Sequence, residues 1–167
     1  CKEECCAFAW KNYSVKRFPS CLALIDKNQK NYWLFDITPE IKEQIHMLDQ
    51  FNCSLAGVFI THAHIGHYIG LLELGLEVMH TRNIPVYVMP KMKYFLEENA
   101  PFTQLIELHN IELVEIKADI ALPLNDSISV TPFLVPHRNE LSETVGFRIE
   151  SENTSLIYIS DIDSWDD

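Results

Sequence analysis

The stretch Thr61-His62-Ala63-His64-Ile65-Gly66-His67 decides what fold and what chemistry the sequence predicts. It follows the apolar run 55–60, which we predict to be a buried strand, and it precedes a helical pattern. In extended backbone, residues two apart point the same way, so His62 and His64 can bind one ion from one side. His64 and His67 lie three apart at the entry to the helix, where they share a face. Neutral imidazole is a common zinc ligand, so the spacing predicts a metal site. The alternative is that these histidines cap the helix or fill a rim.

Around this stretch, short apolar segments alternate with helical patterns, which predicts layered sheets covered by helices. Polar turns at 26–30 and 150–155 each separate two strands and predict hairpins. Thr38 and Pro39 have the residue types of a helix N-cap and of a first helical position. The predicted strands are 20–25, 32–37, 55–60, 86–89, 111–116, 128–135, 145–149 and 156–159, and the predicted helices are 38–50, 90–98 and one from the histidine run to about His80.

Length and composition indicate one globular domain, residues 1–167, and exclude disordered and fibrous classes. Lys and Arg number 13 against 24 Asp and Glu, a formal net charge of −11. A chain this acidic lacks the basic surface of a general nucleic-acid binder, and anionic membranes would repel it. The apolar run 71–79 is interrupted by Glu73 and Glu77, so no membrane span is expected.

The five cysteines are unlike a disulfide framework, because their number is odd and three fall in the first six residues. Two interpretations stay open. Cys1, Cys5 and Cys6 form part of a structural zinc site that needs a further ligand, or all five are free thiols of a reducing compartment. The free thiols favour the cytoplasm, although a longer chain with an export signal before Cys1 stays open.

Four segments, in order along the chain, resemble motifs of the metallo-β-lactamase superfamily. FITHAHIGHYIGL resembles the second motif, His-x-His-x-Asp-His, and LFDIT, LVPHRNELSETVGFRI and LIYISDID resemble the first, third and fourth. The resemblance implies a four-layer αββα sandwich, an α/β fold, incomplete here at one or both ends because no fifth motif is present.

Within the superfamily, THAHIGHYIGL, PVYVMPKMKYFLE, VPHRNELSETVGF and DIDSW resemble pyrroloquinoline-quinone biosynthesis protein B-like proteins. The phosphonate-pathway cyclic phosphodiesterases are a more distant likeness. Both groups carry an N-terminal cysteine cluster that binds structural zinc. The resemblance therefore favours the structural zinc interpretation of Cys1, Cys5 and Cys6, with a different spacing.

The resemblance implies a three-histidine site with an open position, made by His62, His64 and His137. Catalytic zinc uses this arrangement to bind and acidify water. Asp161 is implied as a bridging carboxylate or, with one metal, as the base that takes the proton of water. Without the resemblance, His137 reads as a surface histidine and Asp161 as part of a solvated acidic end.

A second metal site is implied to be incomplete. His67 would belong to it, but Gly66 stands where the family has a ligating aspartate, and the motif that supplies a further histidine is not in the sequence. Only Asp161 remains as a partner for His67. Asp36 and Thr61 are expected to hydrogen-bond the metal loop.

Three functions follow from these residues. The first is a zinc-dependent hydrolase of a small ester or phosphodiester. The second is an iron-dependent oxidoreductase, as the biosynthetic relatives imply, since imidazole and carboxylate also suit iron or manganese. The third is a non-catalytic metal-binding scaffold. The expected partners are a small-molecule substrate and, as in many superfamily members, a second copy of the chain.

Overall fold

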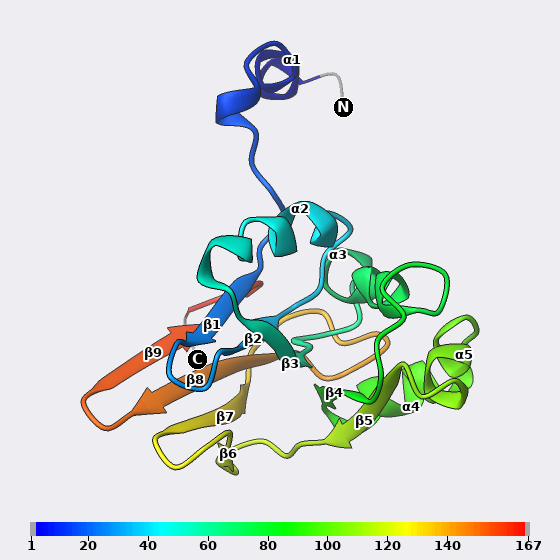
Figure 1. Ribbon diagram of the computed structural model, residues 1–167, viewed down its shortest axis with the longest axis vertical. Coiled ribbons are helices and arrows are strands. Elements are labelled where there is room, and N and C mark those ends of the chain that lie inside the picture. The colour runs from blue at the N-terminus through cyan, green and yellow to red at the C-terminus, as the bar shows by residue number, and fades with distance from the viewer. Residues whose placement is uncertain (1–2, 166–167) are drawn as a thin grey trace.

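The computed structural model describes residues 3–165, in which two β-sheets pack face to face (Figure 1). The first sheet has five strands in the order β1-β2-β3-β4-β5. β1 and β2 are antiparallel, and the remaining neighbours are parallel. Its strands are β1 (Leu22–Asp26), β2 (Asn31–Phe35), β3 (Ser54–Phe59), β4 (Ile84–Val88) and β5 (Ile111–Glu115).

The second sheet has four antiparallel strands in the order β6-β7-β8-β9. Its strands are β6 (Leu122–Pro123), β7 (Ile128–Leu134), β8 (Val145–Ser151) and β9 (Thr154–Tyr158). Both predicted hairpins are confirmed, because β1 pairs with β2 and β8 pairs with β9 through short polar turns.

Alternating side chains of β2 show why the sheets and helices form layers. Tyr32 and Leu34 belong to the core between the first sheet and the helices, and Trp33 and Phe35 belong to the core between the sheets. Successive side chains of a strand point to opposite faces, so a strand buried on both sides separates two apolar layers. The result is the predicted α/β class, with helices on one sheet and the second sheet on its other face.

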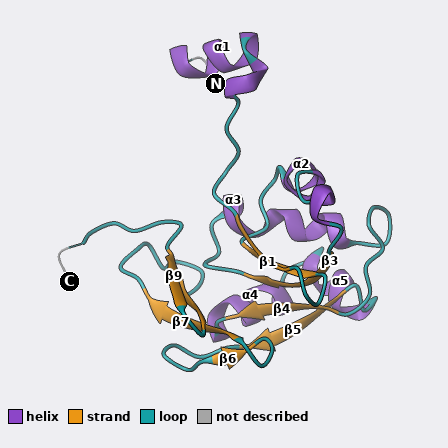
Figure 2. Cartoon of the chain, turned by 60° about the vertical axis from the view of Figure 1, so that its left-hand side comes forward, coloured by secondary structure: helices purple, strands orange, loops and turns teal. Residues whose placement is uncertain are grey.

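The helices that cover the first sheet come from four places in the sequence (Figure 2). The α-helices are α1 (Glu4–Lys11), α2 (Ile41–His46), α3 (Ile65–Tyr68), α4 (Pro90–Glu98) and α5 (Phe102–Glu107), and the 3₁₀ helices are η1 (Tyr13–Val15), η2 (Asp49–Phe51) and η3 (Ile69–Leu74). The buried residues of α2, α3, α4 and α5 join the core on that side, whereas α1 buries none and stands apart. Within residues 3–165, helices therefore cover one sheet, and the outer helix layer on the second sheet is not present.

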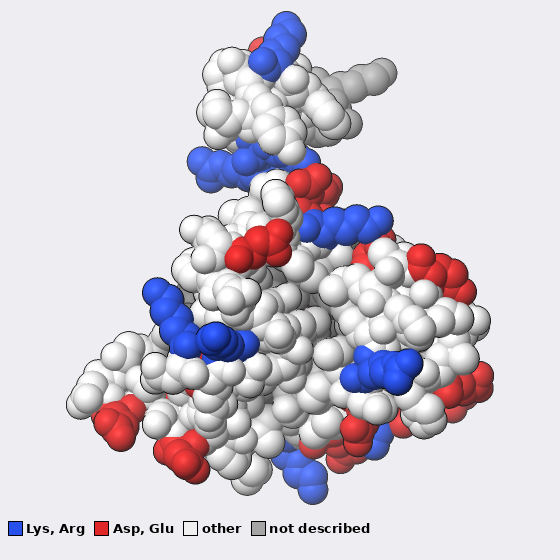
Figure 3. Space-filling model, in the orientation of Figure 1, with Lys and Arg blue, Asp and Glu red and all other residues white. Residues whose placement is uncertain are grey.

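Charged groups are spread unevenly over the face shown in Figure 3. Lys11, Lys16 and Arg17 belong to α1 and the segment that follows it, and basic side chains gather there. Over the rest of this face, acidic and basic side chains are interspersed without a continuous basic surface. Among the described residues, no helix is long and apolar enough to cross a membrane.

Two predicted helices are shorter in the structure. The helix expected over 38–50 is reduced to α2 and η2, and Asn52 then takes a left-handed backbone with φ of 51°. Thr38 lies before α2, where its hydroxyl accepts a hydrogen bond from the Glu40 N–H. The α2 cap position is Glu40, without a side-chain cap, so the predicted N-cap at Thr38 is wrong by two residues.

The helix expected to continue to about His80 is also wrong. It ends as α3 and η3 at Leu74, because the N–H of Gly70 donates to the carbonyl of Ile37 instead of continuing the α-helical ladder. A Cβ at Gly70 would meet the carbonyl oxygens of Thr38 and Ile37, so only glycine permits this approach. This contact fixes α3 against the segment after β2.

Stacked aromatic rings support the ends of the two central strands. Phe35 and Phe59 stack with centroids 4.8 Å apart, and Phe147 of β8 meets both rings edge-on at 5.3 and 5.4 Å. Such pairs are stabilising beyond the area they bury. The chain turns into Asp36 and Thr61 just beyond these rings, so the loops that follow rest on a rigid base.

Candidate metal centre

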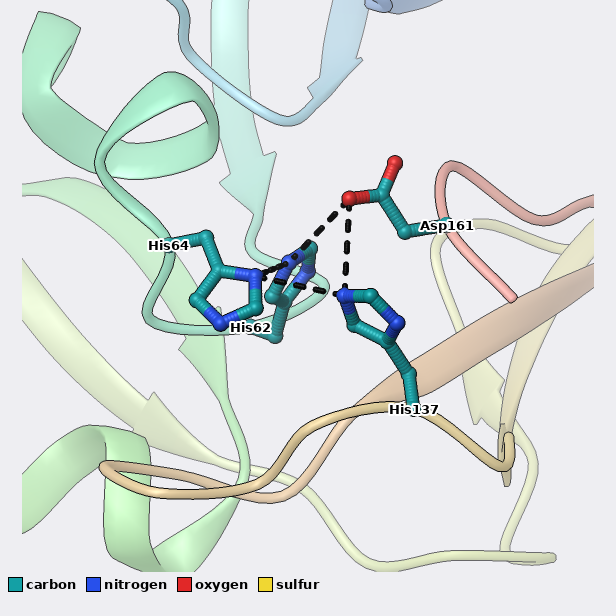
Figure 4. Close-up of side chains that lie close together, drawn as sticks. All are labelled: His62, His64, His137 and Asp161. Atoms are coloured by element: carbon teal, nitrogen blue, oxygen red, sulfur yellow. Dashed lines mark hydrogen bonds and ion pairs between the residues drawn. The ribbon is translucent and has the colours of Figure 1, made fainter. Parts of the chain in front are cut away.

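Four side chains from three loops converge where the two sheets meet (Figure 4). His62 and His64 follow β3, His137 follows β7 and Asp161 follows β9. The loops are joined by backbone, since the Val145 N–H donates to the carbonyl of Thr61 at 3.1 Å. The structure thus brings together residues separated by almost one hundred positions. Two of them, His137 and Asp161, are not identified as ligands by sequence spacing alone.

The distances between the ligand atoms fit a single zinc ion. His64 Nδ1 lies 2.8 Å from His62 Nε2 and 3.2 Å from His137 Nε2. Asp161 Oδ2 lies 3.6 Å from the Nε2 atoms of His62 and His137. All four ligand atoms lie within 4.8 Å of one another. A tetrahedral zinc with bonds of about 2.0–2.1 Å separates its nitrogen ligands by about 3.3 Å, within the observed range.

The outer ring nitrogens of two of these histidines face acidic side chains. His137 Nδ1 lies 2.7 Å from Asp163 Oδ1, and His64 Nε2 lies 3.4 Å from Glu140 Oε2. A carboxylate accepts a hydrogen bond from an imidazole N–H, so it holds the N–H outward and leaves the lone pair of the other nitrogen facing inward. This second layer of contacts is characteristic of histidines that bind metal.

A hydroxyl plays the same role for His62. Its Nδ1 lies 2.9 Å from Thr61 Oγ1, and that hydroxyl donates to Asp36 Oδ1 at 2.9 Å. Because the threonine proton goes to the carboxylate, the oxygen is free to accept from His62. Burial, and then the charges of the neighbouring histidines, lower the pKa of His62 to about 3. His62 is therefore neutral, the form that binds a metal.

Asp36 organises the floor of the site. It is fully buried and has a left-handed backbone with φ of 65°, an uncommon conformation outside glycine. Its carboxylate accepts hydrogen bonds from the N–H and hydroxyl of Thr61 and from the hydroxyl of Tyr158. His67 Nδ1 lies 2.7 Å from Asp36 Oδ2. The geometry places Asp36 and Thr61 in the supporting positions that we expected from the sequence.

His67 lies beside the cluster and contacts it through Asp161. Its Nε2 is 3.5 Å from Asp161 Oδ2, and its ring centroid is 4.3 Å from that of His62. Burial alone lowers the pKa of His67, but the hydrogen bond and charge of Asp36 outweigh burial and raise it. Burial also raises the pKa of Asp36, against the hydrogen bonds of His67 and Thr61. A proton is therefore retained between Asp36 and His67.

Residues 33–167 match the family described as the β-lactamase superfamily domain. The chain belongs to the β-lactamase superfamily. The superfamily includes hydrolases such as ribonuclease Z. The match covers both sheets apart from β1 and the first two residues of β2, and every residue of the His/Asp cluster lies inside it.

Individual superfamily members are similar over most of this chain. Ribonuclease Z from Rippkaea orientalis (strain PCC 8801 / RF-1) is 27% identical over 138 residues, 80% of this chain and 42% of that protein. Zn²⁺-bound PqqB from Methylobacterium extorquens superposes with a TM-score of 0.77 at 22% identity, over 95% of this chain and 58% of that one. The short form of human tRNase Z superposes with a TM-score of 0.60 at 19% identity, over 87% of this chain and 62% of that one.

The two solved structures show a shared fold, the metallo-β-lactamase type that the sequence motifs predicted. The chain spans about two fifths of the length of the ribonuclease Z and less than three fifths of the PqqB chain.

Gly66 leaves open space where other superfamily members are expected to have an aspartate. A Cβ built on Gly66 has no atom within 4 Å, and its backbone is not left-handed. The next residue in the chain, His67, has its Nε2 3.5 Å from Asp161 Oδ2. Within residues 3–165, four ligand atoms therefore converge on one site, and next to it His67 and Asp161 form a pair for which the described residues supply no third ligand.

The N-terminal cysteines that the structure describes, Cys5 and Cys6, do not join the His/Asp cluster. Cys5 is exposed and Cys6 is half-buried on α1, and Cys1 lies outside the described residues. Cys21 donates its thiol to the carbonyl of Asp36 at 3.3 Å, and burial raises its pKa to about 12, so it stays protonated. A structural zinc on Cys1, Cys5 and Cys6 stays a prediction.

Three supporting residues were not identified from the sequence. Asp163 and Glu140 hold the outer nitrogens of His137 and His64, and Ser142 Oγ accepts from the N–H of Ala63 at 2.8 Å. The only signal was Asp163 two positions after Asp161, which in an acidic C-terminal segment is equally typical of a solvated end.

Proposed function

We propose that this chain is a metal-dependent hydrolase that uses one zinc ion, held by His62, His64 and His137, to cleave a small ester or phosphodiester. The convergence of three imidazole nitrogens and Asp161 Oδ2 within 4.8 Å carries this proposal. The membership in a superfamily that includes hydrolases supports it. Since His67 and Asp161 have no third partner at Gly66, one metal is proposed instead of two.

One side of the cluster is buried in the protein and the other is open to solvent. The side chain of His62 is 1% exposed, whereas those of His64 and Asp161 are 26% and 35% exposed. The buried His62 fixes the cluster to the protein, and the exposed parts of His64 and Asp161 leave room for a substrate to approach. The open side lies over Asp161 and His64, so both can touch a substrate.

Zinc, when bound, supplies an acidified water and polarises a carbonyl or phosphoryl oxygen. Asp161 then acts as the base that takes the proton of the attacking water, because its Oδ2 lies among the ligand nitrogens. His67 orients that carboxylate through its Nε2 contact at 3.5 Å. Asp36 fixes His67 from the opposite side of the ring.

Hydrolysis of two chromogenic probes tests this function. The zinc-loaded chain is expected to cleave 4-nitrophenyl acetate, bis(4-nitrophenyl) phosphate or both. The double variant His62→Ala/His64→Ala should lose about a thousandfold in rate, because about 4 kcal/mol of barrier lowering disappears with the metal. His46→Ala is the matched control, since His46 is exposed and its Nδ1 pairs with Asp49, away from the cluster.

Absence of hydrolysis of both probes by the zinc-loaded chain would contradict the proposal. Oxygen consumption by an iron-loaded chain that hydrolyses neither probe would instead support the oxidoreductase, since imidazole and carboxylate suit iron as well. Equal rates in the wild type and the double variant would show that the cleavage does not depend on this site.

A further inference from the structure

The loop between β7 and β8 contacts the segment that carries His62 and His64. The side chain of Ser142, in this loop, is 2% exposed, and its Oγ accepts a hydrogen bond of 2.8 Å from the N–H of Ala63. Ala63 lies between His62 and His64 in the chain, so this bond fixes the backbone that sets the direction of both ligands. The same hydroxyl donates to the carbonyl of Glu143 at 2.9 Å. The buried hydroxyl is therefore used both as donor and as acceptor.

The residue after Ser142 caps a helix. α4 begins at Pro90, and the residue before it, Met89, provides no side-chain cap. Glu143 supplies the missing acceptor from another part of the chain, because its carboxylate accepts from the Lys91 N–H at 3.0 and 3.3 Å. The first N–H groups of a helix have no partner within the helix, and a negative charge there also interacts favourably with the helix dipole. Two adjacent residues of one loop thus bind a metal-ligand segment and the start of α4.

The same loop carries the third histidine ligand, His137, which follows β7. The hydroxyl of Thr144 donates to the carbonyl of Arg138 at 3.3 Å, and this bond links the residue next to His137 to the end of the loop. The Val145 N–H then donates to the carbonyl of Thr61 at 3.1 Å. Hydrogen bonds therefore connect the loop of the third ligand to the segment of the other two.

We propose that Ser142 and Glu143 are positioning residues that preorganise the metal site. Ser142 fixes the backbone between His62 and His64, and Glu143 anchors the loop of His137 to α4. Neither side chain belongs to the four that converge as ligands, so both act through the backbone of the ligand loops. A ligand set binds its ion tightly when the surrounding contacts keep the ligand atoms within about 0.5 Å of the required geometry. This role rests on the proposed function, because it concerns the metal site of that function.

The zinc affinity of the chain tests the role of Ser142 without requiring turnover. Ser142→Ala is expected to bind zinc about tenfold or more weakly than the wild type, because the N–H of Ala63 loses its acceptor and the ligand segment is less firmly held. Competition against a chromogenic chelator measures the affinity, and the His62→Ala/His64→Ala variant gives the binding elsewhere in the chain. Thr131→Val is the matched control and should bind zinc like the wild type, because the Thr131 hydroxyl is buried without a hydrogen-bond partner among the described residues.

The visible spectrum of bound Co²⁺ separates a positioning role from a merely structural one. Its bands depend on the arrangement of the ligands around the ion, so they should shift or weaken in folded Ser142→Ala. Glu143→Ala should also bind zinc more weakly, whereas Glu143→Gln should stay close to the wild type, because its amide keeps an acceptor oxygen for the Lys91 N–H. Glu143 is only half-buried, so its variants provide the same test if Ser142→Ala does not fold.

Two results would overturn the inference. One is wild-type zinc affinity and an unchanged Co²⁺ spectrum in both alanine variants, and the other is a lower unfolding temperature of the metal-free variants without any change in zinc affinity. Hydrolysis of either chromogenic probe by these variants would then leave the proposed function standing. Weaker zinc binding and an altered spectrum in the variants, with a wild type that hydrolyses neither probe, would support the inference and overturn the proposed function.

Discussion

Replacement of Gly66 by aspartate is expected to create a second metal site beside the first. The new side chain fits, because a Cβ at this position meets no atom within 4 Å and the backbone is not left-handed. It would add a carboxylate to His67 Nε2 and Asp161 Oδ2, which lie 3.5 Å apart. Three such groups suffice for zinc with a solvent position, so bound zinc should rise by about one ion per chain. Elemental analysis of zinc-saturated protein measures the increase.

Gly66→Asn is the matched control, since asparagine has the size of aspartate without the negative charge that attracts the metal. It should bind as much zinc as the wild type, and both variants should unfold at nearly the wild-type temperature. A Gly66→Asp variant that is folded and holds no additional zinc would contradict the view that His67 and Asp161 are an incomplete second site.

Removal of the Asp36 carboxylate is expected to destabilise both the fold and the metal site. In Asp36→Ala, the N–H and hydroxyl of Thr61 and the Nδ1–H of His67 lose their acceptor inside a fully buried site. Breaking one partner of a buried ionic network costs about 3–5 kcal/mol in the free energy of unfolding. Loss of such a supporting carboxylate also weakens metal binding by about 10–100-fold. Urea denaturation and zinc titration measure the two effects.

The variant Asp36→Asn removes the negative charge of this side chain and keeps its size. Asparagine keeps an acceptor oxygen and tolerates the left-handed backbone of this position, so its loss of stability should be smaller than that of alanine. Asp126→Ala changes an exposed aspartate and should leave both quantities unchanged. An Asp36→Ala variant with wild-type stability and zinc affinity would show that Asp36 does not support the site.

The strands and their layering could be predicted from local patterns, because a strand buried on both faces is a short continuous run of apolar residues. Trp33, Phe35 and Phe59 belong to such runs, and the structure places them between the sheets. The predicted helix at 90–98 coincides with α4, which begins at a proline and buries Met92 and Leu96. Local spacing was sufficient for these elements, because each is marked by its own pattern of apolar residues.

The helix predicted to reach His80 shows where local spacing fails. Its apolar periodicity is correct, and Leu71 and Leu74 are buried. The backbone hydrogen bond of Gly70, however, goes to Ile37, thirty-three positions away, and the α-helical ladder ends there. The tertiary fold determines which carbonyl group Gly70 approaches. The residues next to Gly70 in the sequence therefore do not predict this hydrogen bond.

Part of the metal site could likewise be predicted from local spacing, and part could not. His62, His64 and His67 share a strand-to-helix segment, so their spacing alone predicts a metal-binding geometry. His137 and Asp161 come from other loops and entered through motif resemblance, and the structure then places their ligand atoms 3.6 Å apart. Asp163 and Glu140 were missed, because an acidic residue that binds the far side of a histidine has no local pattern.

Elemental analysis of the purified chain shows whether His62, His64 and His137 hold a metal beside Asp161. Wild-type protein and the His62→Ala/His64→Ala variant are saturated with zinc, dialysed and compared at equal, folded concentrations. The variant should hold about one zinc ion per chain less than the wild type, while any zinc on the N-terminal cysteines stays in both. Equal metal content in the two proteins would contradict the account, because the cluster would then hold no ion.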